Sequence, residues 1–403
     1  MLSINKETFN KQISFGKPKV KALVGLDIEA GSIAATETGA DGSTKVSQVA
    51  IAPLSGGLIK EGEVADPEAL AAALRSLFTE HKLSKSVRLG VANQRVAVRT
   101  LRLPLVEDEQ ELETAVRFQA QENLPMPLDQ AVLDYRVISR FRNEDGTRGM
   151  DVVAVAARRD MLDTLLAAVR AAGLRPVGID LSAFALIRAL ARDESGSPLA
   201  ANGSAQAPES NGSAAANGNE AAGADASATD AETAVMPHVP SVLYCNLGDV
   251  TNLAVARGAT CLFTRVSPFG VEAIAQKLAE RRTLTLEHAR QWLVHVGLER
   301  PTSEIEGDQE IVTAARETLE EGAPKLADEL RLSLDFYGAQ EGAPAVERIV
   351  VAGPGSIIPG LTDRLQVGIE QQSFATARPT ALSQLSDGDA ARLTVSYGLA
   401  LEE

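Results

Sequence analysis

The sequence has few cysteines, few histidines and no long uninterrupted apolar run. Its two cysteines, Cys245 and Cys261, cannot form a disulfide framework, and its four histidines include no ligand-spaced pair that would suit zinc. No apolar stretch approaches the roughly 20 residues that a membrane-spanning helix needs. Residues 1–14 lack the apolar core of a signal peptide. These absences favour a cytoplasmic protein without a structural metal.

Positive charge is also scarce. The net charge is −15 and the isoelectric point is near 4.9. A chain this acidic is a poor candidate for binding nucleic acid or an anionic membrane through its overall field. A small basic group, Lys17, Lys19 and Lys21, is interpreted as part of a solvated N-terminal arm.

One tract lacks almost every residue that builds a core. Residues 200–234 contain no aliphatic side chain beyond alanine, no aromatic residue, and no lysine or arginine. Such a tract cannot bury enough apolar surface to offset the entropy of ordering. We therefore expect a disordered insertion over 200–235 that separates two halves of the chain.

What the chain does contain is a block that occurs twice. Residues 24–34 read VGLDIEAGSIA and residues 243–253 read LYCNLGDVTNL. Each copy is an apolar strand ending at Asp27 or Asn246, then a turn of small residues, then a second apolar run. Such a repeat suggests duplicated halves that face each other across a cleft, with two turns of backbone N–H groups that can cradle phosphate. A third glycine turn, at Gly353 and Gly355, follows the strand at 349–351.

The pattern of apolar residues changes between Pro104 and Gly178. Apolar residues recur every fourth position in a predicted helix that ends before Pro125. Two strand-like runs and a second helix follow, which predicts a compact α+β unit inserted in the first half. The expected division of the chain is an arm at 1–20, a first domain at 21–103 and 179–199, the insert at 104–178, the low-complexity tract at 200–235, a second domain with a helical subdomain at 236–378, and a C-terminal segment at 379–403 that packs back on the core.

The three glycine turns resemble the first phosphate loop, the second phosphate loop and the adenosine loop of the actin-like ATPase superfamily. Within the insert and after it, the segments FQAQENLPMP (118–127), VLDY (132–135), AAGLRP (171–176) and AFA (183–185) resemble the PilM family of type IV pilus assembly. The resemblance implies an α/β fold: a duplicated actin-like, ribonuclease-H-like core of two domains facing a nucleotide cleft, with a small α+β subdomain inserted in the first half.

The same resemblance implies that ATP with Mg²⁺ occupies the cleft. The nucleotide-binding positions it implies are Asp27, Gly31, Ser32, Ile33, Asn246, Gly248, Asp249, Thr251, Gly353, Pro354, Gly355 and Ser356, with Asp27 and Asn246 holding Mg²⁺ indirectly. Two residues depart from the family pattern. Glu29 stands where glycine is usual and would face phosphate, and Asn246 replaces an acid and so lacks its charge. Nucleotide affinity should therefore be weak, or turnover very slow.

Another departure lies at residues 287–293, where relatives commonly place acidic and lysine contacts to adenosine. This chain offers Arg290 and Leu293 there.

A further implication of the resemblance is a scaffold that binds the cytoplasmic N-terminal segment of the membrane protein PilN. It would lie at the inner membrane through PilN and other pilus inner-membrane and motor components, without inserting itself. The groove for the peptide would lie between the first core subdomain and the insert. The residues assigned to it are Leu103, Leu112, Val116, Gln119, Leu124 and Pro125, and core packing is the alternative role for the apolar ones.

Two other functions are compatible with an actin-like core. The first is a competent ATPase or phosphotransferase, which would need a carboxylate placed to accept a substrate proton, and no sequence signature identifies one. The second is an FtsA-like cell-division tether, which expects a C-terminal membrane-binding helix. The segment 397–403 is too short and too acidic for that helix.

Deletion of residues 200–234 should leave the melting temperature nearly unchanged, because the tract has no side chains with which to build a core. Thermal unfolding of the deleted and full-length chains measures this. A large loss of stability would show that the tract packs against the folded domains.

Overall fold

The computed structural model describes residues 22–39, 43–143, 145–192, 239–340, 342–369 and 372–401. The expected N-terminal arm and the low-complexity tract at 200–235 lie outside these residues. The expectations for those two segments therefore stay predictions.

Two five-stranded sheets share one design. The first has the order β10-β6-β1-β2-β3 and the second the order β15-β14-β11-β12-β13. In each, the first three strands form an antiparallel meander, and the next two add in parallel beside the first strand. The strands of the first sheet are β1 (Ala22–Ile28), β2 (Ser32–Gly39), β3 (Val46–Pro53), β6 (Ser86–Val91) and β10 (Arg175–Leu181). Those of the second are β11 (Ser241–Leu247), β12 (Thr251–Arg257), β13 (Thr260–Ser267), β14 (Arg348–Ala352) and β15 (Ser373–Thr376). The duplication predicted from the repeated block is confirmed by this topology.

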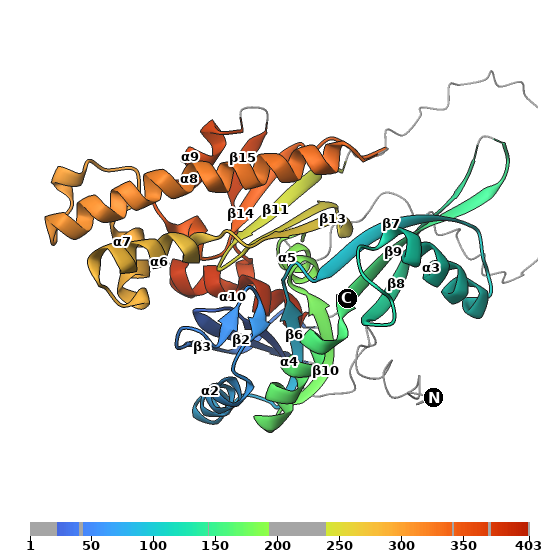
Figure 1. Cartoon of the computed structure of the whole chain (residues 1–403), viewed down its shortest axis with the longest axis horizontal. Helices are drawn as coiled ribbons and strands as arrows, with labels where there is room; N and C mark the ends of the chain where they lie inside the picture. Colours follow the sequence, from blue (N-terminus) through green and yellow to red (C-terminus); the bar gives the residue numbers. More distant parts are fainter. Residues whose placement is uncertain are drawn as a thin grey trace, which may run out of the picture.

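Two helices fill the space between the sheets. They are α5 (Ser182–Leu190) and α10 (Asp387–Ala400), and Figure 1 shows α10 in red between the blue sheet and the yellow-to-orange sheet. On β11, Val242 and Tyr244 pack toward α5, whereas Leu243 and Cys245 point to the opposite face. This alternation is the period of two expected of a strand. Because β11 is apolar on both faces, its sheet can be covered on both sides.

Other helices cover the outer faces. The first sheet is covered by α2 (Pro67–Glu80) and α4 (Arg159–Ala171), and the second by α6 (Val271–Arg282), α7 (Leu286–Val296) and α8 (Gln309–Gly338). The predicted cap of α2 is confirmed, since Asp66 accepts a hydrogen bond from the Ala69 amide. The remaining short elements are β4 (Ile59–Lys60), β5 (Glu63–Val64), η1 (Thr302–Glu304), η2 (Pro354–Ile357), α9 (Leu361–Val367) and η3 (Thr380–Leu382).

The insert is a three-stranded sheet, β7-β9-β8, with one helix on it. Its elements are β7 (Val96–Pro104), α3 (Glu109–Asn123), β8 (Ala131–Arg142) and β9 (Arg148–Arg158), and they extend to the right of the core in Figure 1. The sheet thus begins at Val96, earlier than the expected boundary at 104, because the strand pattern read over 87–103 divides between two sheets. The helix α4, expected within the insert, instead packs its apolar face against α2 in the first core.

The C-terminal segment packs on the core as predicted. Leu393 and Tyr397 of α10 lie buried against the first sheet, and the Tyr397 hydroxyl donates to the Thr44 carbonyl at 3.0 Å. Among the described residues, no helix is long and apolar enough to cross a membrane.

Glycines let the helices approach each other and the sheet closely. A Cβ at Gly25 of β1 would lie 1.9 Å from the Ser396 carbonyl oxygen of α10. A Cβ at Gly398 of α10 would lie 1.9 Å from the Ala185 carbonyl oxygen of α5. Both distances are far below van der Waals contact, so the layer between the sheets depends on these two positions having no side chain.

Substitution of Gly398 by alanine should lower the free energy of unfolding by about 1–3 kcal/mol through overpacking. The loss should appear even though alanine favours helix over glycine by about 1 kcal/mol. Gly388→Ala, in the same helix, is the matched control, because its added Cβ meets only a side-chain carbon of Ile357 at 3.6 Å. Equal melting temperatures for the two variants would contradict the packing described here.

Candidate functional site

The repeated turns face each other across the space between the two halves. Loop 1 (residues 29–31) joins β1 to β2, and loop 2 (residues 248–250) joins β11 to β12. The two loops touch directly, because the Ala30 amide donates to an Asp249 carboxylate oxygen across 219 residues of sequence. The third turn begins at Gly353, whose φ of +80° is a conformation that glycine adopts without strain.

A cavity of about 480 Å³ lies beside these three turns. Loop 1 and loop 2 line one end, and Pro354 and Ile357 of η2 line another wall. The helix α7 contributes Arg290, and α10 contributes Arg392. The position between two backbone turns and a glycine-initiated turn matches the place where the sequence predicts a nucleotide.

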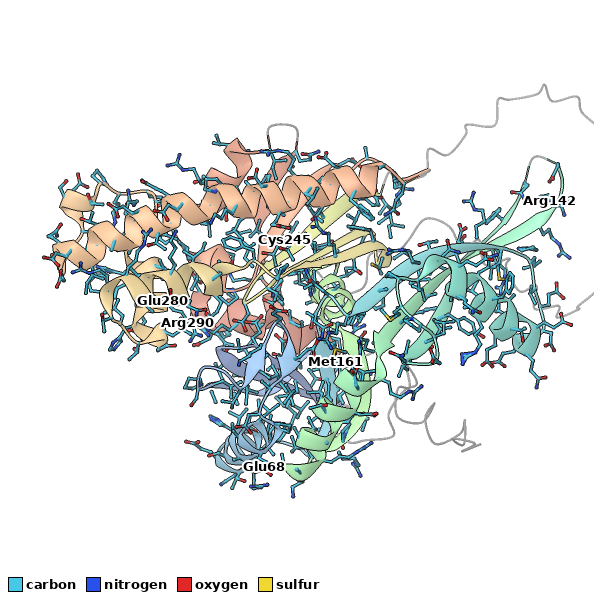
Figure 2. All side chains as sticks on the ribbon, viewed as in Figure 1. Glu68, Arg142, Met161, Cys245, Glu280 and Arg290 are labelled. Carbon is cyan, nitrogen blue, oxygen red and sulfur yellow. The ribbon has the colours of Figure 1, made fainter. Side chains whose placement is uncertain are left out.

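A larger cavity of about 1040 Å³ also borders the two loops and shares Glu29, Asp249 and Glu272 with the smaller one. Asp27 and Asn246 line it, as do the hairpin of β4 and β5 and the helix α6. Asn252 also lines it and is only 2% exposed, and neither polar atom of its side chain has a hydrogen-bond partner. Figure 2 labels Glu280 and Met161, two residues that line this cavity from α6 and α4.

The predicted nucleotide positions divide between cavity walls and structural roles. Gly31, Ser32, Gly248, Asp249 and Pro354 line the smaller cavity, and Asp27, Asn246 and Asp249 line the larger one.

The remaining five predicted positions do not line either cavity. Ile33 is buried in the first core, and the Thr251 hydroxyl donates to the Phe269 carbonyl at 2.7 Å. The Ser356 hydroxyl donates to the Gly353 carbonyl at 2.7 Å, and Gly355 packs against Leu247. Gly353 itself is needed beside the site, since a Cβ there would lie 2.3 Å from the Asn246 side-chain oxygen.

Three carboxyl groups gather where the loops meet, and each has a raised pKa. Burial, followed by the charge of Asp249, raises the pKa of Asp27 to about 7, although a hydrogen bond from Ser182 opposes the shift. Burial and then the charge of Asp27 raise the pKa of Glu29 to about 8, against the opposing effect of Arg392. Burial and then the charge of Glu29 raise the pKa of Asp249 well above its usual value. The raised pKa values mean that ionising these three carboxyl groups together costs free energy.

Arg290 lies over loop 1. Its Nε donates to Glu272 at 2.8 Å and its Nη1 to Glu287 at 3.1 Å. A Cβ at Gly31 would lie 2.0 Å from Arg290 Nη2, so the guanidinium covers this glycine. Arg290, expected to contact adenosine, therefore lies against loop 1. Leu293, the other residue expected there, is 2% exposed within the second core and also contributes to the lining of the smaller cavity.

The residues assigned to a peptide groove are mostly internal to the insert. Leu103, Val116 and Leu124 are buried between α3 and the insert sheet, and Leu112 packs against the same cluster. Gln119 is half-buried, and Pro125 is exposed. Leu103, Leu112, Val116 and Leu124 thus belong to the core of the insert.

A different groove, of about 330 Å³, lies between the insert and the helix α5. From the insert it is lined by Ile138 and Val155, and from α5 by Phe184 and Ile187. Cys261 closes one side from the second half. The resemblance implies a groove between the first core subdomain and the insert, and this groove lies between those two parts. Its lining residues differ from the predicted ones, because they come from three segments far apart in the chain.

Sequence reasoning also missed several residues of the cleft. Glu272 pairs with Arg290, and Arg392 donates to the Ser32 hydroxyl at 3.3 Å. Asn252 could have been noticed as a polar residue one position into the second strand of the repeat. Glu272 and Arg392 carry no local signal, since each reaches the site only through helix packing.

The duplicated sheets, the helices between them and the cleft with its three turns define a protein of the actin-like fold class. Residues 25–207 match the model of the family described as type IV pilus assembly protein PilM, so the resemblance seen in the sequence is confirmed.

Among solved structures, the chain is similar to one in the PilM–PilN type IV pilus biogenesis complex. The identity is 23%, the alignment covers 95% of this chain and 98% of that chain, and the TM-score is 0.67. It also matches the ethanolamine utilization protein EutJ from Carboxydothermus hydrogenoformans, at 13% identity, 98% and 95% coverage and a TM-score of 0.47. A third match is MreB5 of Spiroplasma citri bound to ADP, at 13% identity, 94% and 95% coverage and a TM-score of 0.46.

Stability should fall as pH rises from about 4 to about 8 in buffer without magnesium. Asp27 and Glu29 have folded-state pKa values of about 7 and 8, above the ordinary 3.8 and 4.5. The folded protein therefore binds more protons than the unfolded chain across this window, and loses stability as they dissociate. Glu29→Gln should reduce the fall in melting temperature by several degrees.

The matched control for this prediction is Glu280→Gln, on the exposed surface of α6 at the mouth of the larger cavity. Its pH dependence should follow that of the parent chain. Identical pH profiles for the parent and Glu29→Gln would contradict the assignment of a raised pKa to Glu29.

Proposed function

We propose that the protein is an adapter of a type IV pilus machine that binds the cytoplasmic N-terminal segment of a PilN-like membrane protein. Support comes from the match of residues 25–207 to the PilM family and from the shared fold with a chain of the PilM–PilN complex. In this proposal the adapter lies at the inner membrane through its partner, linking the motor to the membrane components.

The groove between the insert and α5 is the observation that carries the proposal. Its apolar walls, which include Ile138, Val155 and Phe184, suit side chains of an extended peptide, and its length runs beside the edge strand β8. A peptide on such an edge can pair through backbone groups while its side chains enter pockets. The groove also joins the insert to the layer between the sheets, so that a bound peptide contacts both.

We further propose that a nucleotide occupies the smaller cavity, with its phosphates toward loops 1 and 2. The backbone turns and the wall at Pro354 fit an adenine nucleotide. Asp27 and Asn246, which line the larger cavity beside the same loops, are the residues that would hold Mg²⁺ through its waters. When bound, Mg²⁺ would supply positive charge among the carboxylates. The raised pKa values of Glu29 and Asp249 mean that negative charge is costly at this place, and a phosphate would add to it. This supports weak nucleotide binding, and regulation by nucleotide occupancy in preference to rapid turnover.

Titration of the purified full-length chain with the N-terminal peptide of its PilN partner, with and without Mg-ATP, tests the adapter function. Ile138→Asp should weaken peptide affinity about tenfold or more, because it places a charge in an apolar groove. The matched control is Phe118→Asp on α3, where the ring is 63% exposed and outside the groove. Equal affinities for the two variants, or no peptide binding by the parent chain, would contradict the proposal.

A further inference from the structure

In the contact between the two loops, backbone amides of loop 1 bind a carboxylate of loop 2 in the way that such amides bind phosphate. The Ala30 amide donates to the Asp249 carboxylate, and the Gly31 backbone makes a hydrogen bond to the same group. Successive backbone N–H groups that converge on one anion form the kind of concavity that binds phosphate. Here the anion is a side chain from the opposite half of the protein.

Neighbouring side chains close the remaining space between the loops. Glu29 of loop 1 lies against Gly248 of loop 2, where a Cβ would be 2.4 Å from its Oε1. Arg290 covers Gly31 from the other side and is fixed by its pair with Glu272. The glycine of each loop is thus covered by a side chain, and the position that phosphate groups would take is occupied.

We propose that the Asp249 carboxylate acts as an internal substitute for a nucleotide phosphate, competing for the Ala30 and Gly31 amides and latching the two halves together when no nucleotide is bound. The proposal rests on nucleotide occupancy of the cleft, as proposed above. It goes further in naming the group that the nucleotide must displace. The same contact then links nucleotide binding to the separation of the two halves.

The latch explains how Asp249 can line the proposed nucleotide cavity and also compete with the nucleotide. A phosphate group entering the loops loses the Ala30 and Gly31 donors to Asp249, and it also lies against the acidic side chains of Asp249 and Glu29. Burial and the Glu29 charge raise the pKa of Asp249, so the backbone donors offset only part of the cost of holding a carboxylate there. Removing the carboxylate should therefore favour the nucleotide on two counts.

Asp249→Ala in the full-length chain should tighten Mg-ATP binding by about tenfold or more in calorimetry, because a hydrogen bond to a charged competitor is removed. In the nucleotide-free protein, hydrogen exchange at the Ala30 and Gly31 amides should become faster. Asp249→Asn keeps the shape of the side chain and loses its charge. Its ATP affinity should lie between those of the parent chain and Asp249→Ala, and it provides the test if the alanine variant unfolds.

The matched control is Glu280→Ala. It removes one negative charge from the lining of the larger cavity, and its side chain bonds Gln276 on its own helix and not loop 1. Equal ATP affinities for the Asp249 and Glu280 variants would overturn the competition, and unchanged exchange at Ala30 and Gly31 would overturn the latch. Peptide titrations distinguish the two proposals. If the chain binds the peptide and Asp249→Ala leaves ATP affinity unaltered, only the latch is contradicted. If the chain does not bind the peptide, the adapter function is contradicted.

Discussion

The close packing of α5 and α10 between the two sheets is the constraint on which the rest of the structure depends. Gly25 and Gly398 allow this packing, since a side chain at either position would overlap a carbonyl oxygen of a neighbouring helix. With the helices held there, each repeated strand–turn–strand block ends at the same edge of the layer. The cleft is therefore a consequence of how the halves pack, and this packing is enough to make its two loops face each other.

Packing two similar blocks face to face also brings like charges together. Asp27 and Glu29 come from the first half and Asp249 from the second, and Arg290 and Arg392 partly offset them. The departures at Glu29 and Asn246 therefore acquire a physical meaning: Glu29 adds an acid to the cluster where the loops meet, and Asn246 contributes an amide with no charge.

The insert adds a second place where distant parts of the chain meet. Its own core is closed by α3, which explains why Leu103, Val116 and Leu124 are internal. The opposite face of its sheet approaches α5, and the groove lies there. Since α5 also packs against α10 and the second sheet, the same helix borders the proposed peptide groove and supports the cleft. A peptide and a nucleotide would thus act on one connected layer.

The duplicated halves, the insert and the three glycine turns can be read from the chain, because each depends on local patterns: alternation in strands, four-residue spacing in helices, and small residues at turns. The family resemblance adds Asp27, Gly31, Gly248, Asp249 and Pro354 as residues of the cleft region. Three features become visible only in the folded chain: β7 belongs to the insert, Arg290 covers loop 1, and the amide of Ala30 donates to Asp249. These depend on segments as much as 219 residues apart. No local pattern encodes which side chain from the other half will meet a given turn.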